Sequence, residues 1–409
     1  MPKPLHVAYR VYQGVLRAAS YLMDFSPPQL LEGPGAIKRL PAFIKEKGFG
    51  RVLVVTDKGL RSLGLLDGFL AGLEAAGLAY AVYDGVQPNP TISNIEEALA
   101  LYRAERCEAL VAFGGGSPMD CAKAAGARFA NPRKSVRQLR GLLKVTRKPP
   151  ALFAVPTTAG TGSETTVAAV VSDPETHEKY AISDPKLLPP YAVLDPELTL
   201  GLPPRITAPT GMDALTHAVE AYVGRANTPE THARAEEAVR LVFAWLEKAY
   251  KDGSDLEARG AMLRASFCGG FAFTRAYVGY VHAIAHKLGG LYALPHGLAN
   301  AVVLPHVLDW YGDAAAPALA RLAEIAGVAK PGTTPAEAAR AFIAEIRAMN
   351  ARMGIPEGFA EIRAEDVPAI VRSALREANP TYPVPRIMDA AECEAVVRGL
   401  MRDAPGGTR

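Results

Sequence analysis

Cysteine is scarce in this 409-residue chain: it has only Cys107, Cys121, Cys268 and Cys393, and no two of them form a CxxC pair. Such scattered cysteines exclude a disulfide framework and a thiolate zinc site, and we expect a reducing, cytoplasmic setting. An excess of one charge is also lacking, because 45 basic and 42 acidic side chains leave a net charge of +3. A nucleic-acid partner would require a dense basic stripe, so none is expected.

Long apolar runs are absent as well: none approaches the ~18 residues of a membrane-spanning helix, so an integral membrane protein is not expected. Near the N-terminus, valines at about helical spacing are interrupted by arginines, at Val7, Val11, Val15, Arg10 and Arg17. A signal peptide needs an unbroken apolar centre, and because the arginines interrupt this one, a signal peptide is not expected. We expect an amphipathic helix packed on the body or on a partner subunit, with a membrane-surface helix as the alternative.

The length of the chain suits two domains rather than one compact core. In the first half, short apolar runs of strand type, at 51–57, 79–85, 109–115 and 151–158, alternate with helical patterns. This alternation predicts a parallel sheet covered by helices on both faces. Residues 166–185 predict a hairpin beside that sheet.

From about Leu202 the pattern changes to long helix-periodic segments, capped by Ser, Thr, Asp or Pro, at 203–225, 229–253, 255–290 and 334–354. We therefore divide the chain into a helical N-terminal extension over 1–30, an α/β domain over 31–204 and an all-helical domain over 205–409.

A glycine-rich turn joins a predicted strand to the next helix. Gly114, Gly115 and Gly116 precede Ser117 and Pro118. Serine at the cap with proline just inside is a strong helix start. Bare amides at such a start form a cradle for a pyrophosphate. A purely structural tight turn is the alternative, and the spacing is not the usual GxGxxG.

Two further features follow predicted strands. Asp57 ends the run at 51–57, where an acidic side chain can bind an adenosine ribose and repel a 2′-phosphate. The loop PTTAGTGSE at 156–164 can wrap a ribose and diphosphate, or form only a structural turn. Three such loops favour a nucleotide site at the carboxyl edge of the sheet, although the acidic residue precedes the glycines, the reverse of the usual order.

Histidine is sparse except in one short stretch, which holds three of the chain's eight. His282 and His286 lie four apart on a predicted helix, as do Asp213 and His217, so each pair shares a helix face. With His296, three segments can converge on one point. One carboxylate and several imidazoles suit Fe(II) or Zn(II), although a lone residue of this kind is usually structural. The pattern does not single out which histidine is not a ligand.

Five motifs together make the sequence resemble the iron-containing (group III) alcohol dehydrogenases, the family of lactaldehyde and 1,3-propanediol dehydrogenases. They are GGGSPMDCAK, PTTAGTGSE, DPELTLGLPP, TGMDALTHAVEAY and VHAIAHKLGGLYALPHGLANAVVLPHV. The resemblance runs from about Leu31 to Asp313 and more weakly to the end. It implies a dehydroquinate synthase-like fold, with an α/β N-terminal dinucleotide-binding domain and an all-helical C-terminal domain for metal and substrate.

The resemblance also implies residue roles. Ligands of Fe(II), with zinc possible, would be Asp213, His217, His282 and His296. The remaining histidine, His286, matches the family's position beside the nicotinamide and would act in catalysis. Contacts to NAD would come from Asp57, Gly114, Gly115, Gly116, Ser117, Asp120, Thr157, Thr158, Thr161 and Lys179. The substrate pocket would include Phe273 and Arg275.

Arg275 departs from the family pattern, because many members carry Asn at this place in AFxNAxLG. Its guanidinium would either favour an anionic or polar substrate or pair with a carboxylate of the protein. We prefer the second interpretation. The N-terminal thirty residues or so also precede the family's usual start.

The resulting hypothesis is an NAD(H)-linked alcohol dehydrogenase or aldehyde reductase for small primary alcohols or diols, assembled as a homodimer or larger homo-oligomer. One alternative is a lyase of the same fold that uses NAD transiently together with zinc. It would need a Lys/Arg cluster near the substrate, and it would accumulate no NADH. The other alternative is a non-catalytic metal- or nucleotide-binding relative.

Overall fold

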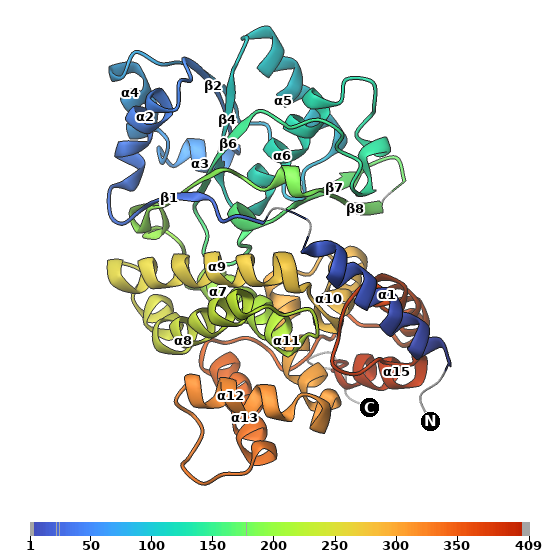
Figure 1. The fold of residues 1–409 in the computed structure, drawn as a ribbon. Helices are drawn as coiled ribbons and strands as arrows, with labels where there is room; N and C mark the ends of the chain where they lie inside the picture. The colour runs from blue at the N-terminus through green and yellow to red at the C-terminus, as the bar shows by residue number, and fades with distance from the viewer. Residues whose placement is uncertain (1–3, 22, 24, 177, 403–409) are drawn as a thin grey trace. The chain divides into compact units, whose positions relative to one another are not determined.

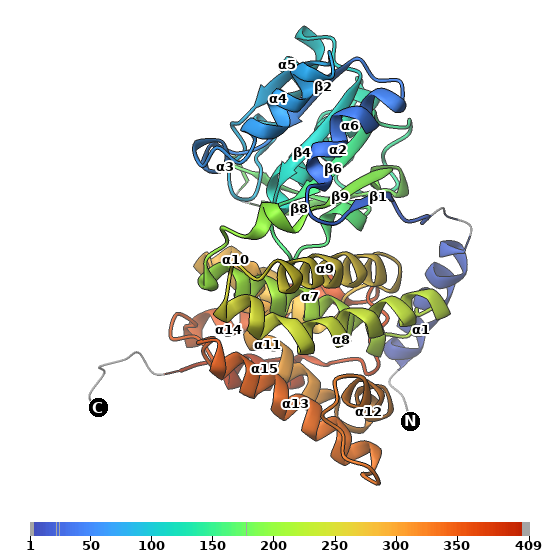
Figure 2. The same cartoon turned by 90° about the vertical axis from the view of Figure 1, so that its left-hand side faces the viewer.

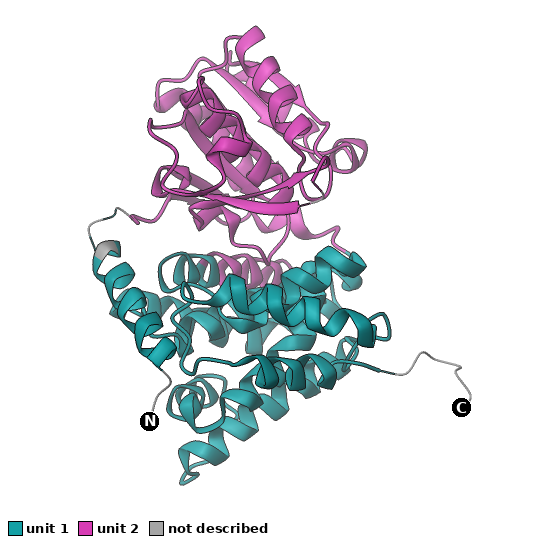
Figure 3. Cartoon of the chain, turned by 90° about the vertical axis from the view of Figure 1, so that its right-hand side faces the viewer, with its two compact units in different colours: residues 1–23, 203–253, 268–409 teal, residues 24–202, 254–267 magenta. Residues whose placement is uncertain are grey.

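The computed structural model describes residues 4–21, 23, 25–176 and 178–402; the ends of the predicted extension and of the predicted helical domain lie partly outside them. The chain forms two compact units, coloured separately in Figure 3. The sheet unit comprises Asp24–Leu202 and Ser254–Phe267. The helical unit comprises Met1–Met23, Pro203–Gly253 and Cys268–Arg409. The three-part division at 1–30, 31–204 and 205–409 stays a prediction. Among the described residues, no helix combines the length and the apolar character that crossing a membrane requires.

A six-stranded, fully parallel sheet forms the centre of the sheet unit (Figure 1). In spatial order its strands are β1 (Gln29–Glu32), β9 (Tyr191–Leu194), β6 (Ala151–Pro156), β4 (Ala109–Gly114), β2 (Arg51–Val55) and β3 (Ala79–Tyr83). The predicted parallel sheet and its four predicted strands are confirmed. Strands β1 and β9 were not predicted.

Helices cover both faces of the sheet, as predicted, because alternate residues of each strand point to opposite sides. Val52 and Val54 of β2 pack with α2 (Ala36–Glu46) and α4 (Asp67–Ala75). Leu53 and Val55 pack with α5 (Ile92–Ala104) and α6 (Gly116–Ala130). The short helix α3 (Lys58–Ser62) follows β2.

The predicted hairpin is also present. Strands β7 (Ala168–Asp173) and β8 (Glu178–Ser183) pair antiparallel, and β5 (Gly141–Leu142) adds to β8 in parallel. Single 3-10 turns complete the unit at η1 (Arg137–Leu139), η2 (Ser163–Thr165), η3 (Pro185–Leu187) and η4 (Pro196–Thr199).

The helical unit contains α7 (Pro204–Val223), α8 (Pro229–Lys251), α9 (Leu256–Ala276, which begins in the sheet unit), α10 (Tyr280–Tyr292), α11 (His296–Tyr311), α12 (Ala316–Ile325), α13 (Pro335–Arg352), α14 (Val367–Ala378) and α15 (Ala390–Gly399), with 3-10 turns at η5 (Gly312–Ala314) and η6 (Ala364–Asp366). Helices α7 and α8 lie side by side (Figure 2). Capping boxes start α8 at Thr228 and α13 at Thr334. The helical character predicted for this half is confirmed.

Two expectations about the 255–290 segment were wrong. The segment is broken between α9 and α10, where Tyr277 adopts a left-handed conformation with φ 67°. Gly289 and Gly290 do not end the second helix, which continues to Tyr292 and stops at Ala293, whose φ is 54°. Both glycines keep helical backbone, and the chain turns only at Ala293, where the backbone becomes left-handed.

Helix α1 (Pro4–Ser20) packs on the helical unit through its polar side. Arg10 and Gln13 donate hydrogen bonds of 2.6–3.0 Å to main-chain carbonyls within residues 380–385. The opposite side is apolar and exposed, with Val11 64% and Val15 63% exposed, beside Leu5, Val7 and Tyr12. The predicted amphipathic helix is present, but its apolar face points outward.

Candidate active site

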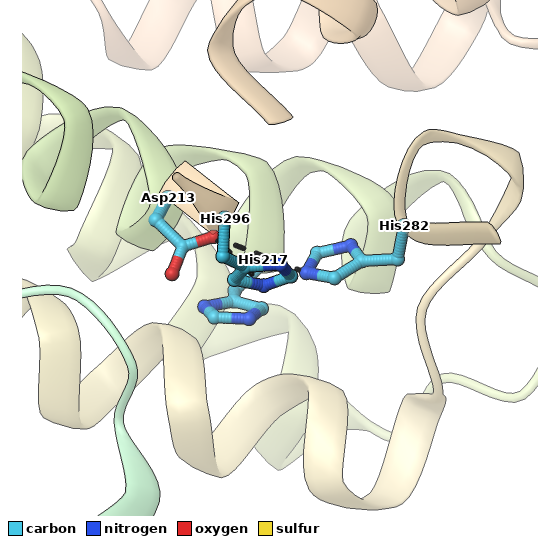
Figure 4. Close-up of side chains that lie close together, drawn as sticks. All are labelled: Asp213, His217, His282 and His296. Atoms are coloured by element: carbon cyan, nitrogen blue, oxygen red, sulfur yellow. Dashed lines mark ion pairs between the residues drawn. The ribbon is translucent and has the colours of Figure 1, made fainter. Parts of the chain in front are cut away.

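Four of the predicted site residues meet within the helical unit. Asp213 and His217 lie one turn apart on α7, His282 lies on α10, and His296 is the first residue of α11. One ligand-type atom from each residue lies within 4.8 Å of the corresponding atom of every other, and Figure 4 shows the side chains turned toward one another. The Asp213 Oδ1 atom is 3.6 Å from Nε2 of His296 and 4.0 Å from Nε2 of His282.

Close packing of α11 against α7 places His296 in this cluster. The left-handed Ala293 ends α10, and Pro295 precedes the first turn of α11. The next residue, Gly297, touches α7: a Cβ there would lie 2.4 Å from the Pro209 carbonyl oxygen and 3.3 Å from the Asp213 Cβ. Glycine is therefore required where α11 crosses α7, and that crossing sets His296 beside Asp213.

The donor set fits a single divalent ion. Asp213, His217 and His282 are buried, and buried groups of this kind are normally paired or bound to metal. Burial raises the pKa of Asp213 and holds that of His282 well below its ordinary value. One oxygen and three nitrogen donors suit iron or zinc, whose bonds to such atoms are about 2.0–2.2 Å long. Atoms within 4.8 Å of one another can therefore share one ion after small adjustments.

Two polar residues that the sequence prediction missed touch the cluster. The fully buried Asn300 donates from Nδ2 to Asp213 Oδ1 at 2.7 Å. The same nitrogen lies 3.1 Å from Nε2 of His282 and of His296. Glu220, on α7, lies 2.6 Å from Nδ1 of His282, and burial raises its pKa to about 7. Asn300 follows His296 by four residues, a helical spacing that could have signalled it.

His286 lies outside the four-residue cluster but beside it. Its ring stacks on His296 with centroids 5.2 Å apart. Its Nδ1 is 2.7 Å from Oε1 of Glu377, which also accepts a hydrogen bond from the Tyr382 hydroxyl at 3.0 Å. Burial lowers the pKa of His286, but the carboxylates of Glu377, Asp213 and Glu220 together raise it, so that the pKa ends above its ordinary value. Sequence reasoning missed Glu377, which lies 91 residues away.

The two predicted substrate-pocket residues differ in their surroundings. Phe273 stacks on the His217 ring with centroids 4.2 Å apart, so it lies directly beside the cluster. The guanidinium of Arg275 lies 5.1 Å from the centre of the Tyr21 ring, in the segment after α1. Arg275 therefore contacts the N-terminal extension.

In the sheet unit, the glycine turn packs against the PTTAGTGSE loop. Strands β4 and β6 are parallel neighbours, so their carboxyl ends meet at one edge. A Cβ on Gly115 would lie 3.2 Å from Thr158 Oγ1, and one on Gly116 would lie 3.2 Å from Thr161 Cγ2. Gly114 has φ 150°, and a Cβ there would lie 2.6 Å from the Pro118 ring. The turn thus depends on glycine, which leaves its amides accessible to a ligand.

The start of α6 differs from the prediction. The helix begins at Gly116 with Gly115 as its N-cap, and no side chain caps it. Ser117 lies inside the first turn, and its Oγ accepts a hydrogen bond from the Asn89 amide at 3.1 Å. Ser117 as the capping residue was therefore wrong. A helix start without a side-chain cap keeps its amides for an anion, which the cradle hypothesis requires.

The remaining predicted cofactor residues lie in two places: Asp57 and Thr157 at the carboxyl edge of the large sheet, and Asp120 and Lys179 at the hairpin of β7 and β8. Asp57 and Thr157 follow β2 and β6 at the same sheet edge; Asp57 accepts the Leu60 amide at 2.9 Å and caps α3. Asp120 accepts hydrogen bonds from Ser163 Oγ and the Val170 amide, and burial raises its pKa to about 6. Lys179 lies on β8, where partial burial lowers its pKa.

Family models match both halves of the chain. Residues 27–196 match the iron-containing alcohol dehydrogenase model, and residues 207–401 match the C-terminal model of the same family. The chain therefore belongs to the iron-containing alcohol dehydrogenase family. It is an alcohol dehydrogenase of that type, which confirms the predicted family and enzyme class.

Individual relatives cover almost the whole chain. The 1,3-propanediol dehydrogenase of Klebsiella pneumoniae is 41% identical over 93% of this chain and 99% of its own length. The NAD-dependent methanol dehydrogenase of Bacillus methanolicus is 37% identical over 92% of this chain and 99% of its own length.

Solved structures share the fold. A 1,3-propanediol oxidoreductase superposes with a TM-score of 0.89 at 40% identity, covering 93% of this chain and all of its own. The sulfoacetaldehyde reductase of Bifidobacterium kashiwanohense, solved with NAD⁺, superposes with a TM-score of 0.83 at 27% identity, covering 92% and 98%. The predicted fold class is confirmed.

Proposed function

We propose that the protein catalyses the reversible, metal-dependent oxidation of small primary alcohols or diols by NAD⁺, giving an aldehyde, NADH and a proton. The observation that carries this proposal is the convergence of Asp213, His217, His282 and His296. The NAD-dependent methanol dehydrogenase and the NAD⁺ complex among the relatives support the choice of cofactor.

In this proposal the four converging residues hold iron, or zinc in its place. When bound, the metal acts as a Lewis acid toward the substrate oxygen, and NAD carries the hydride. His286 accepts the substrate proton at Nε2, while its Nδ1 faces Glu377, which stabilises the protonated ring. Phe273 lies beside the metal ligand His217 and limits the space for the substrate.

The sheet unit binds NAD. The amides of Gly115, Gly116 and Ser117 cradle the diphosphate, and Gly114 permits the turn. Asp57 accepts hydrogen bonds from the adenosine ribose and repels a 2′-phosphate. The family's other contact positions are Asp120, Thr157, Thr158, Thr161 and Lys179. Asp120 also accepts hydrogen bonds from Ser163 Oγ and the Val170 amide, so in this proposal it supports the loop that lines the cofactor.

The protein is further proposed to be a cytoplasmic homodimer or larger homo-oligomer. The outward apolar face of α1 supports self-association, because a contiguous exposed apolar surface marks an interaction site. Arg10 is directed inward to carbonyls of residues 384 and 385, so it does not serve as a contact for lipid phosphates.

The test combines metal analysis of anaerobically purified protein with an NADH assay on C2 to C6 alcohols and diols. We expect about one metal per chain and net NADH formation. Asp213→Asn should lose both, whereas His306→Gln, on the same helix as His296 but outside the cluster, should keep both. Metal-loaded protein that forms no net NADH with any alcohol would contradict the dehydrogenase proposal and favour the lyase.

A further inference from the structure

Glu220 joins α7 to the first turn of α10. Its side chain is buried, and its Oε1 accepts the Val281 amide at 2.8 Å while Oε2 lies 2.6 Å from His282 Nδ1. Gly279 permits this approach, because a Cβ there would lie 2.7 Å from Glu220 Oε1. One carboxylate therefore holds both the backbone that starts α10 and the imidazole of its third residue.

The other side of the His282 ring identifies where its proton lies. Nε2 is 3.1 Å from Nδ2 of Asn300, and an amide nitrogen can only donate a hydrogen bond. A proton on Nε2 would point at this donor, so Nε2 is unprotonated, and in a neutral imidazole the proton must then be on Nδ1, which faces Glu220. Two independent neighbours thus select the same tautomer.

We propose that Glu220 is a positioning residue for the metal site: it fixes the Nδ1–H tautomer and the orientation of His282, so that Nε2 keeps its lone pair toward the other ligands. This inference rests on the metal-binding part of the proposed function. Carboxylate partners of this kind orient a ligand imidazole and raise its basicity, and their loss typically costs 10- to 100-fold in metal affinity.

Glu220→Gln separates this role from simple helix capping. Glutamine keeps the size of the side chain and one oxygen that can still accept the Val281 amide. Its amide group, however, donates to His282 Nδ1 and places the ring proton on Nε2, where it blocks ligation. We expect the dissociation constant for Zn(II), measured by chelator competition at pH 8, to rise 10- to 100-fold, with the unfolding temperature of the metal-free protein unchanged.

Glu377→Gln is the matched control, because it makes the same change beside His286, which is not a proposed ligand. Its Zn(II) affinity should equal that of the wild type. Unchanged affinity in Glu220→Gln, or an equal loss in both variants, would overturn the assignment to Glu220.

A second measurement needs no metal. Long-range ¹⁵N–¹H spectra of histidine-labelled, metal-free protein should show His282 protonated on Nδ1 in the wild type and on Nε2 in Glu220→Gln. The same tautomer in both proteins would overturn the proposal. Failure of the wild type to bind Zn(II) would instead contradict the proposed function, and the tautomer comparison would still decide what Glu220 does to His282.

Discussion

At the scale of single residues, His286 is the group whose loss should separate catalysis from metal binding. It lies beside His296 but outside the four-residue cluster. We expect His286→Ala to keep its metal and to lose turnover by about 10²- to 10⁴-fold, the usual contribution of a positioned proton acceptor. Metal analysis and the turnover number measure the two effects. Full turnover in this variant would exclude His286 as the proton carrier.

Asp57 should determine the choice between NAD and NADP. Asp57→Gly removes the carboxylate that is proposed to repel a 2′-phosphate. Because glycine replaces an N-cap at a cost of only a few tenths of a kcal/mol, α3 should persist. We expect the ratio of kcat/KM for NAD⁺ to that for NADP⁺ to fall by about tenfold or more, which corresponds to ~1.4 kcal/mol. An unchanged ratio would remove Asp57 from the cofactor site.

Glu164 should make the metal-free protein less stable as the pH rises. Burial raises its pKa to about 7, although Lys123 lowers it somewhat. Between the ordinary pKa and 7 the folded state binds more protons than the unfolded state, so the free energy of unfolding falls across that window. A pKa difference of one unit corresponds to about 1.4 kcal/mol, so Glu164 accounts for up to about 3 kcal/mol of this decrease in the free energy of unfolding. Glu164→Gln should abolish that part of the decrease. Urea unfolding at pH 4.5 and 7.5 measures it, and parallel pH dependences in both proteins would contradict the assignment.

Most of the site was predictable wherever its residues share a helix face. Asp213, His217 and Glu220 follow one another at intervals of four and three on α7, so even the missed Glu220 had a local signal. Asn300 likewise follows His296 by four residues on α11, so it had the same kind of local signal. Glu377 had none, because its contact with His286 depends on packing between α10 and α14.

At the scale of helices and strands, a substitution at Gly290 tests whether this glycine is an ordinary helical position within α10. Gly290 is exposed, and a Cβ there meets nothing within 4 Å. We expect Gly290→Ala to raise the free energy of unfolding by about 0.5–1 kcal/mol, because glycine has more freedom to lose in a helix. Thermal and urea unfolding measure the change.

Gly269, inside α9, is the matched control for this substitution. A Cβ there would lie 2.9 Å from the Ala214 carbonyl oxygen, which is part of α7 and cannot move aside as a side chain could. We expect Gly269→Ala to destabilise the protein by about 1–3 kcal/mol. Destabilisation of similar size by Gly290→Ala would mean that this part of α10 needs its glycines.

The long elements were predictable and the short ones were not. Strands β2, β4 and β6 are continuous apolar runs, and a buried parallel strand needs nothing else. Strands β1 and β9 have four residues each; β1 pairs with β9, whose register partners lie 162 positions along the chain (191 − 29), and β9 also pairs with β6. Such pairing leaves no local pattern. The break before α10 was missed for a related reason, since the left-handed Tyr277 interrupts an unbroken helical period.

At the scale of the whole molecule, α1 is the part that the family relationship does not explain. The family model begins at residue 27, whereas α1 covers Pro4–Ser20. The helix is about 25 Å long at 1.5 Å per residue. One such helix face is smaller than the ~800 Å² per partner of a standard interface, so it can strengthen an assembly but not make one alone. If the protein is the proposed homo-oligomer, the apolar side chains of α1 would add to the contact between copies of the chain.

Charge on the outer face of α1 should therefore weaken self-association without unfolding the protein. We expect the double variant Val11→Glu, Val15→Glu to raise the dissociation constant of the oligomer by about tenfold or more, since burying one such side chain contributes roughly 1.5–3 kcal/mol. Sedimentation velocity over a dilution series measures it. Leu63→Glu, at a 75% exposed site in the sheet unit, is the control and should change nothing. An unchanged dissociation constant, combined with loss of binding to anionic vesicles in the double variant, would show that α1 meets a membrane surface instead.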